Sequence, residues 1–280
     1  MSAASLPPGL TIIGEGLNTN RPDFGTIVRE RDEKAFLKEL RRQQRSGVTH
    51  LDFNASGSGS PDSPNAERDA LLWMLDNALP AMKNNVGLVL DSLSPDVIAA
   101  GLERIGGRAG TILNGMTADF EHIQKLLPLL SKSEIGAVAI LTTRNQPQNA
   151  GERLKLAEQL LDIVTKARIA QDRIYIDPQV LPLAADAAHV SAVLELCGQI
   201  KHRWPRAHLL AGLSNISFNL PQRRLLNRTL APMLLSAGVD TLICDPTDRA
   251  LRQTLLAAQA LLGRDDFFAT YLSQVEQHRG

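Results

Sequence analysis

One pattern constrains this chain more than any other: a short apolar segment, a polar or Gly-rich turn and an amphipathic segment recur eight times. The apolar segments are nearly continuous, which is typical of parallel strands that are covered on both faces. The amphipathic segments carry apolar residues three and four positions apart, as helices do. Eight such units, joined by right-handed crossovers, predict a closed (β/α)8 barrel. The expected strands are 10–16, 49–55, 86–92, 110–116, 137–143, 173–179, 208–214 and 240–246. The expected helices are 32–46, 65–80, 95–105, 118–131, 151–169, 187–203, 222–237 and 247–262.

The length of the chain fits this fold. Its 280 residues suit one barrel of about 250 residues, so we expect 1–280 to form a single domain of the α/β class, a TIM barrel. The last segment, 265–280, predicts an extra C-terminal helix packed on the outside. A doubly wound open sheet is the alternative. Its first turn would need a G-x-G-x-x-G fingerprint, which the segment GEGLNTNRP after the first strand lacks.

Charge and composition exclude several classes of protein. Lys and Arg number 30, as do Asp and Glu, and this balance argues against nucleic acid as a partner. The apolar runs are far shorter than the roughly 20 residues that a membrane helix needs. The start, MSAASLPPG, lacks the features of a signal peptide. Cys197 and Cys244 are too few for a disulfide framework or a cysteine zinc site. We therefore expect a cytoplasmic enzyme that binds no membrane.

Polar side chains gather where the expected strands end, the position at which such barrels carry their chemistry. All of them are carboxylates or carboxamides, with no histidine, cysteine or lysine among them. They are Glu15, Asn18, Asp52, Asn54, Asp91, Asn114, Asp177, Asn215, Asn219 and Asp245.

Some of these residues have an equally good structural explanation. Asp52 and Asp245 could simply cap the helices that follow them. Asp91 has no such role, because Ser94 before Pro95 is the better cap. Asp177 precedes a proline, which keeps it extended, and the next helix begins some nine residues later. Asp91 and Asp177 are therefore predicted to act on a ligand, and Asn114 and Asn215 are interpreted in the same way.

The residue types indicate the ligand. No H-x-x-x-H or C-x-x-C spacing suggests a metal site, so we expect none. Gly-rich phosphate turns after the seventh and eighth strands and a strand lysine for a Schiff base are also missing. Carboxylates and amides together suit a neutral heterocycle such as a 2-amino-4-oxopyrimidine. One carboxylate can accept hydrogen bonds from its ring N–H and its exocyclic amine, a charge-assisted contact worth roughly 1.5–3 kcal/mol.

Seven motifs carry a resemblance to a known family. They are IIGEGLN (12–18), HLDFNAS (50–56), VLDS (89–92), ILN (112–114), YIDPQVLP (175–182), GLSNISFN (212–219) and LLNRTL (225–230). Through them the chain resembles the methyltetrahydrofolate:corrinoid protein methyltransferases of the pterin-binding barrel superfamily. That superfamily also includes dihydropteroate synthase and the folate domain of cobalamin-dependent methionine synthase.

The resemblance implies roles for particular residues. The pterin ring contacts of the family fall on Asp91, Asn114 and Asp177, and its mobile asparagine, which approaches N5 of the folate, falls on Asn215. The remaining candidates for substrate binding are Glu15, Asp52 and Asn219.

The resemblance also implies a reaction and its partners. A methyl group would move between N5 of tetrahydrofolate and a corrinoid. The cobalamin would come from a separate corrinoid protein, because the chain has no D-x-H-x-x-G motif. A homodimer is expected, together with a polar, open rim that admits the partner.

The chain departs from the family in three places. Gly16 replaces the arginine of the family's GERxN start, the segment 56–65 lengthens the loop after the second strand, and Arg223 and Arg224 stand where one arginine is usual. These two arginines are predicted to contact the folate tail or the partner, or else to lie solvated at a helix start. A dihydropteroate synthase-like enzyme fits less well. That family has a lysine on the seventh strand and a Ser-x-Arg pair after the eighth, whereas this chain reads GLSN and DPTDR there. A non-catalytic pterin- or folate-binding barrel stays open as a third possibility.

Overall fold

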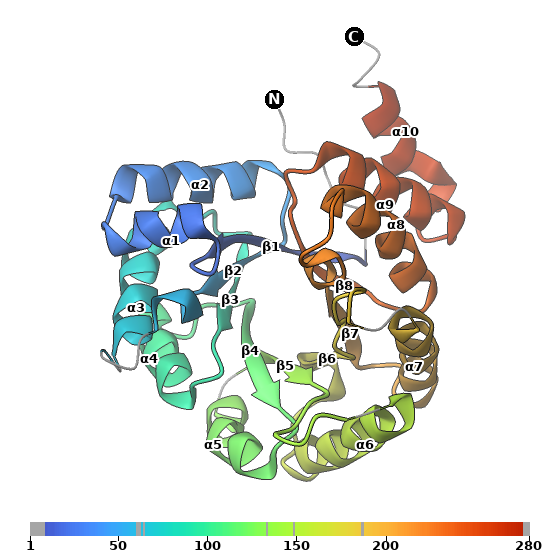
Figure 1. Cartoon of the computed structure of the whole chain (residues 1–280), viewed down its shortest axis with the longest axis horizontal. Coiled ribbons are helices and arrows are strands. Elements are labelled where there is room, and N and C mark those ends of the chain that lie inside the picture. The colour runs from blue at the N-terminus through green and yellow to red at the C-terminus, as the bar shows by residue number, and fades with distance from the viewer. Residues whose placement is uncertain are drawn as a thin grey trace.

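The computed structural model describes residues 9–59, 63, 65–132, 134–147, 149–185 and 188–276. In these residues eight parallel strands form a closed barrel in sequence order, with the first strand paired to the last (Figure 1). The strands are β1 (Thr11–Asn18), β2 (His50–Asn54), β3 (Gly87–Asp91), β4 (Thr111–Thr117), β5 (Gly136–Ile140), β6 (Ile174–Asp177), β7 (His208–Gly212) and β8 (Thr241–Cys244). The barrel predicted from the repeat is confirmed.

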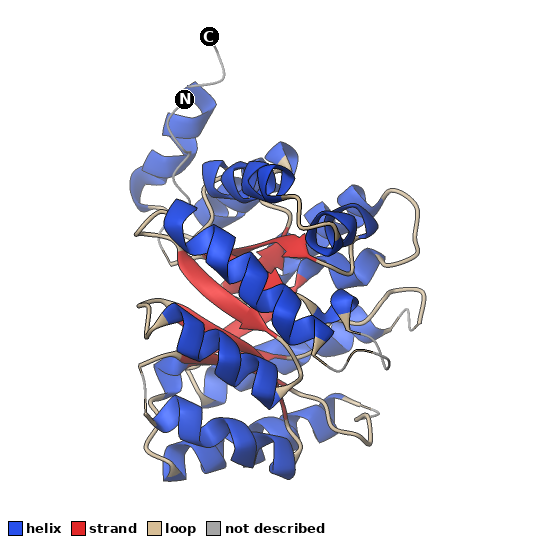
Figure 2. Ribbon diagram, turned by 90° about the vertical axis from the view of Figure 1, so that its left-hand side faces the viewer, coloured by secondary structure: helices blue, strands red, loops and turns tan. Residues whose placement is uncertain are grey.

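Helices surround the barrel on the outside, as the side view also shows (Figure 2). They are α1 (Pro22–Arg29), α2 (Glu33–Arg45), α3 (Ala66–Ala78), α4 (Pro95–Ile105), α5 (Phe120–Ser131), α6 (Ala150–Lys166), α7 (His189–Arg203), α8 (Arg223–Ser236), α9 (Arg249–Leu261) and α10 (Ala269–Glu276). Each predicted helix is present, and α10 is the expected extra helix. Residues 277–280 lie outside the described residues, as do 1–8 and, within the 56–65 loop, 60–62 and 64.

Helix α1 was not predicted. It is only eight residues long and contains Gly25, so it offers too few apolar repeats to give a helical pattern. Its Phe24 and Val28 are nevertheless buried. Pro22 occupies the first turn, where its missing N–H costs no hydrogen bond. Packing of one apolar face therefore stabilises a helix that the local sequence pattern does not predict.

Two apolar layers build the core. Inside the barrel, Ile13, Val89, Ile112, Val138 and Leu210 pack together and fill the space between the strands. A larger cluster lies between the strands and the helices and includes both cysteines, which are buried and free. The barrel is thus closed by side chains below the carboxyl ends of its strands.

The helix caps decide between the alternatives left open for the strand-end acids. Ser94 accepts a hydrogen bond from the N–H of Val97 at 3.4 Å and caps α4, as predicted. Helix α9 is capped by Asp248, not by Asp245. Asp52 lies inside β2, and the next α-helix begins only at Ala66. The capping interpretation of Asp52 and Asp245 is therefore wrong.

No helix of the described residues is both long and apolar enough to cross a membrane.

Candidate active site at the carboxyl ends of the strands

A cluster of carboxylates occupies the barrel mouth. Asp52 is only 2% exposed, and its Oδ1 has no hydrogen-bond partner in the described residues. Burial raises the pKa of Asp52 well above its usual range, and the neighbouring charge of Asp91 raises it further. Asp91, across the β2–β3 pair, accepts a hydrogen bond from Nδ2 of Asn54 at 2.9 Å. Burial raises its pKa to about 6, while hydrogen bonds from Asn54, Asp52 and Asn114 act in the opposite direction.

Asn114 joins this cluster through a bulge in β4. The register with β5 shifts between Asn114 and Met116, and Gly115 between them has a φ of 124°. A Cβ at Gly115 would lie 2.4 Å from the carbonyl oxygen of Ser92, so only glycine fits there. Asn114 itself is 8% exposed and hydrogen bonds to Asp91. The bulge therefore fixes the amide beside the carboxylate.

Asp177 ends β6 in a constrained turn. Its Oδ1 accepts a hydrogen bond from the N–H of Gln179 at 2.7 Å, and Gln179 has a φ of 65°. Burial raises the pKa of Asp177 to about 6, and the charge of Arg153 from α6 opposes that shift. The His189 ring supports the same turn, with its Nε2 2.9 Å from the N of Leu181. Asp177 thus has a structural contact that the sequence did not reveal.

Asn215 lies in a different setting from the one predicted. Strand β7 ends at Gly212, so Asn215 does not end a strand but lies in a 3-10 helix, η4 (Leu213–Ser217). Its side chain is exposed. The neighbouring Ser214 donates a hydrogen bond from Oγ to Oε1 of Glu15 at 2.6 Å. Burial raises the pKa of Glu15, and the bond from Ser214 acts against this shift.

The remaining candidates lie at the edge of this cluster. Asn219 is exposed, has a φ of 59° and makes no hydrogen bond to the other candidates in the described residues. Arg223 donates from Nε to Oγ of Ser217 at 3.1 Å and from Nη2 to the carbonyl of Ser214 at 2.9 Å. Arg224 is exposed. The two arginines therefore differ: Arg223 is anchored on the loop after β7, and Arg224 extends into solvent.

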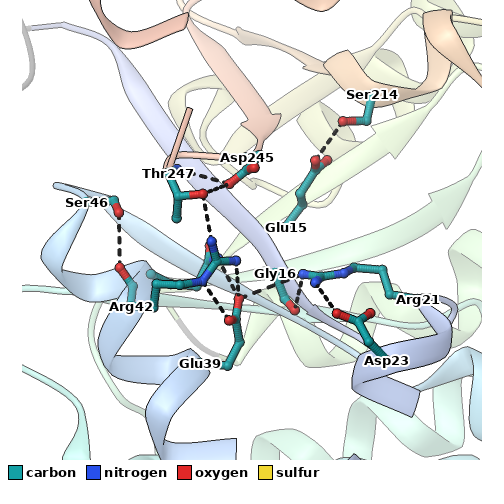
Figure 3. A network of polar contacts seen from close by, with 11 residues as sticks. Glu15, Gly16, Arg21, Asp23, Glu39, Arg42, Ser46, Ser214, Asp245 and Thr247 are labelled. Carbon is teal, nitrogen blue, oxygen red and sulfur yellow. Dashed lines mark hydrogen bonds and ion pairs between the residues drawn. The ribbon is translucent and has the colours of Figure 1, made fainter. Parts of the chain in front are cut away.

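The structure explains Gly16, where the family has arginine. A Cβ at this position would lie 2.5 Å from Oε1 of Glu39, and Gln43 of α2 would clash as well. Figure 3 shows that Arg21 occupies the space beside it and donates from Nη1 to the Gly16 carbonyl at 3.0 Å. Arg42 binds Glu39 and, through Nη1, the hydroxyl of Thr247 at 2.8 Å. Arg21, just before α1, and Arg42 of α2 thus supply positive charge beside β1 in place of a strand arginine.

Large apolar side chains are exposed at the rim of the mouth. Leu93 after β3 is 65% exposed, Phe120 after β4 is 66% exposed, and Phe218 after β7 is 55% exposed. These apolar side chains stand on three separate segments that follow the strands. The rim therefore carries apolar as well as polar side chains, and the expectation of a polar, open rim stays a prediction.

Several contributing residues escaped the sequence analysis. Asn54 was noted only as a strand-end amide, although it holds Asp91. Ser214 lies within the motif GLSNISFN, but nothing in the motif shows that Glu15, 199 positions earlier, accepts a hydrogen bond from its hydroxyl. Arg153 carries no signal at all, because it lies within an ordinary helix pattern. Contacts between distant segments cannot be deduced from one sequence.

No group of three or more His, Cys, Asp or Glu side chains that could hold a metal ion occurs in the described part of the chain. The prediction that the reaction needs no metal on this polypeptide stays a prediction. What the arrangement offers instead is a set of buried acceptors and amides at the mouth of a barrel.

A barrel of this topology with acids and amides at its mouth defines a class of protein, and the sequence comparison identifies the same class. Residues 14–245 match the family described as pterin binding enzyme, and the chain belongs to that family. The resemblance inferred from the motifs is confirmed.

Individual relatives narrow the class further. A methylcorrinoid:tetrahydrofolate methyltransferase of Eubacterium limosum is 28% identical over 272 residues, which are 96% of this chain and 97% of that protein. Methionine synthase of Mycobacterium tuberculosis is 27% identical over 83% of this chain, which spans only 20% of that enzyme.

Solved structures are similar in fold. A Yersinia pestis dihydropteroate synthase bound to a pterine-sulfa conjugate superimposes with a TM-score of 0.68 and 15% identity, covering 91% of this chain and 94% of that one. The Thermus thermophilus dihydropteroate synthase gives a TM-score of 0.64 and 19% identity, over 90% of this chain and 94% of the other. At such identities these structures bear on the fold alone.

Proposed function

We propose that this protein is a methyltransferase that moves a methyl group between N5 of tetrahydrofolate and a corrinoid carried by a second protein. The observation that carries the proposal is the match to a methylcorrinoid:tetrahydrofolate methyltransferase along 97% of that relative's length. The match to methionine synthase, which covers a fifth of a larger enzyme, supports the same chemistry. The barrel mouth supplies acceptors for a pterin ring.

The site residues take their roles from this geometry. Asp91 and Asp177 accept hydrogen bonds from the N–H groups of the pterin, and Asn114 beside Asp91 meets its mixed donor and acceptor edge. Asp52 lies beside Asp91, and burial raises its pKa so that it can donate a hydrogen bond to Asp91 and support the charge there. Such surroundings favour positive charge on the ring as the bond between N5 and the methyl carbon breaks or forms.

We propose that Asn215 acts on the reacting nitrogen. An amide cannot give up a proton, but its N–H and oxygen can hydrogen bond to N5 and to the charge that develops there. Its exposed position on η4 leaves it accessible to a bound folate. Arg224, exposed at the start of α8, is a candidate contact for the folate tail or for the partner.

The partner would approach from the mouth. A corrin ring and its carrier protein need a surface that combines apolar and polar contacts. The exposed side chains of Leu93, Phe120 and Phe218 supply the apolar part. A homodimer remains a further proposal, with the outer helices as the surface available to it.

The experiment that tests the function combines the purified chain with 5-methyltetrahydrofolate and a reduced corrinoid protein. We expect the chain alone to bind the folate and turn nothing over, and the mixture to give methylated corrinoid, visible by absorbance. The matched control is Asn215→Ala. Condensation of a pterin pyrophosphate with p-aminobenzoate by the chain alone would instead establish the dihydropteroate synthase alternative.

A further inference from the structure

Hydrogen bonds join Glu15, Ser214 and Arg223 at the loop that carries Asn215, and we call these three residues the latch. Ser214 donates from Oγ to Oε1 of Glu15 at 2.6 Å, and its carbonyl oxygen accepts from Nη2 of Arg223 at 2.9 Å. The same arginine reaches Ser217 through Nε, and the Ser217 hydroxyl donates to the Ser214 carbonyl at 3.2 Å. Asn227 of α8 lies 3.4 Å from the Ser214 hydroxyl. One short loop is therefore tied to β1 on one side and to α8 on the other.

The Glu15 contact is specific. In the described residues Ser214 is the only side chain that hydrogen bonds to the Glu15 carboxylate, although Asp245, Arg223 and Arg21 act on it through charge. Figure 3 shows the Glu15 side chain directed away from the Glu39 and Arg42 contacts and toward Ser214. A partly buried carboxylate with a single partner has a strong preference for keeping it, because losing the bond leaves the charge unsatisfied.

The space around Asn215 is limited as well. A Cβ added to Gly212, the last residue of β7, would lie 3.0 Å from Nδ2 of Asn215. The amide therefore folds back over the end of the strand, and glycine leaves it room. Phe218 donates its N–H to the Asn215 carbonyl at 3.1 Å, which fixes the backbone of the same turn.

We propose that Glu15, Ser214 and Arg223 are positioning residues that hold the Asn215 amide in the orientation used for methyl transfer, in a space that Gly212 keeps open. The proposal rests on the proposed function, since it assigns the latch a role only through Asn215. It differs from a general structural role in one respect. The latch affects turnover through Asn215 and has no separate contact with the pterin.

A double-mutant cycle tests this assignment. Ser214→Ala should lower kcat by on the order of 10–10²-fold, because small displacements of a catalytic group have effects of that size. The folate Kd should stay within about twofold, a change below 0.5 kcal/mol. In an Asn215→Ala background the same Ser214→Ala change should have no further effect. If the two losses multiply, Ser214 acts independently of Asn215 and the latch is refuted.

Conservative variants sharpen the test at both ends of the latch. Glu15→Gln keeps an oxygen that accepts from Ser214 and should retain most of the activity, whereas Glu15→Ala should behave like Ser214→Ala. Thr229→Ala on α8 removes an exposed hydroxyl that, among the described residues, bonds only to the Leu225 carbonyl, and it serves as the matched control. Equal loss in Glu15→Gln and Glu15→Ala would contradict the hydrogen-bond role.

A second readout needs no partner protein. With asparagine labelled by nitrogen-15, the side-chain amide signal of Asn215 should shift or broaden in Ser214→Ala and stay in place in Thr229→Ala. An unchanged signal in Ser214→Ala would overturn the latch. The failure of the proposed function gives a different pattern, because the wild-type chain itself would then transfer no methyl group while the amide signal still responds to Ser214→Ala.

Discussion

At the scale of single residues, the site is dominated by carboxylates whose burial opposes their charge. The pKa values of Asp91 and Asp177 both rise to about 6 from an ordinary 3.8, with burial as the first cause. Groups so strongly desolvated are candidates for ligand contact, because a donor from the ligand replaces the lost water. The same burial has a consequence for stability that can be measured without a ligand.

The contribution of Asp91 and Asp177 to the stability of the free protein should fall as the pH rises through the window from about 4 to about 6. The folded state holds the protons of Asp91 and Asp177 more tightly than the unfolded state does, so the stability they provide is present at low pH and is lost above their folded pKa. Asp177→Asn keeps the Oδ1 acceptor and removes the charge. At pH 7.5 it should therefore raise the unfolding free energy by up to about 2–3 kcal/mol, and with it the melting temperature. At pH 4 the melting temperature should change little. If Asp177→Asn and the wild-type chain melted at the same temperature at both pH values, this account would be contradicted.

Folate binding should show the opposite preference for these charges. Asp91→Asn and Asp177→Asn should each weaken binding of 5-methyltetrahydrofolate at neutral pH by at least about tenfold, or 1.4 kcal/mol, because each removes a charged acceptor. Titration calorimetry measures the change. The control is Asp172→Asn, an exposed carboxylate paired with Arg206. If both folded mutants bound the folate with unaltered affinity, the pterin would not bind at this cluster.

Asn215 should matter more for the rate than for binding. Its hydrogen bond to N5 strengthens only as charge develops, so Asn215→Ala should lower kcat by about 10²–10³-fold, as loss of one preorganised donor does elsewhere, with a smaller change in folate Kd. Steady-state kinetics with a corrinoid protein separates the two quantities. A mutant altered in KM alone would show that Asn215 only orients the ring.

At the scale of elements, the bulge of β4 positions Asn114. Gly115→Ala would force a Cβ to within 2.4 Å of the Ser92 carbonyl at a φ of 124°. We expect a loss of stability of more than about 1 kcal/mol, together with weaker folate binding. Gly198→Ala in α7, where a Cβ meets nothing within 4 Å, is the matched control and should be neutral or stabilising. Thermal melts and calorimetry on both variants decide the matter, and an undisturbed Gly115→Ala would contradict the role of the bulge.

The same scale shows what the sequence could predict. Strands and helices followed from periodicity because each buries a face of its own, and Ser94 was identified from its place before Pro95. Helix α1 was missed because tertiary packing, not local pattern, stabilises its two turns. Asn215 was expected at a strand end, yet β7 stops three residues earlier at Gly212 and the chain turns into η4. The contacts of Asn54 and Ser214 depend on which loops the closed barrel brings together, and no local rule contains that information.

At the scale of the whole molecule, the open mouth must serve a small substrate and a second protein. Phe218 lies on the loop of Asn215 and is 55% exposed, so it can contact a partner while the folate occupies the acids below. Phe218→Ser should raise the KM for the corrinoid protein by about tenfold, as truncation of an interface aromatic does, and leave folate affinity unchanged. Added salt should lower the rate of association, because charged rim residues steer encounter. A variant with unchanged KM would place the partner elsewhere.

The central claim is the transfer of a methyl group between folate and a corrinoid protein, and the most direct measurement follows the methyl carbon itself. A corrinoid protein carrying a carbon-13 methyl group is mixed with tetrahydrofolate and the purified chain, and the carbon-13 spectrum is recorded with time. We predict that the methyl signal of the corrinoid falls as a signal of 5-methyltetrahydrofolate rises. An Asp91→Asn, Asp177→Asn double mutant should leave the label in place. A labelled methyl group that stays on the corrinoid with the wild-type chain, while the chain binds folate, would contradict the proposed function.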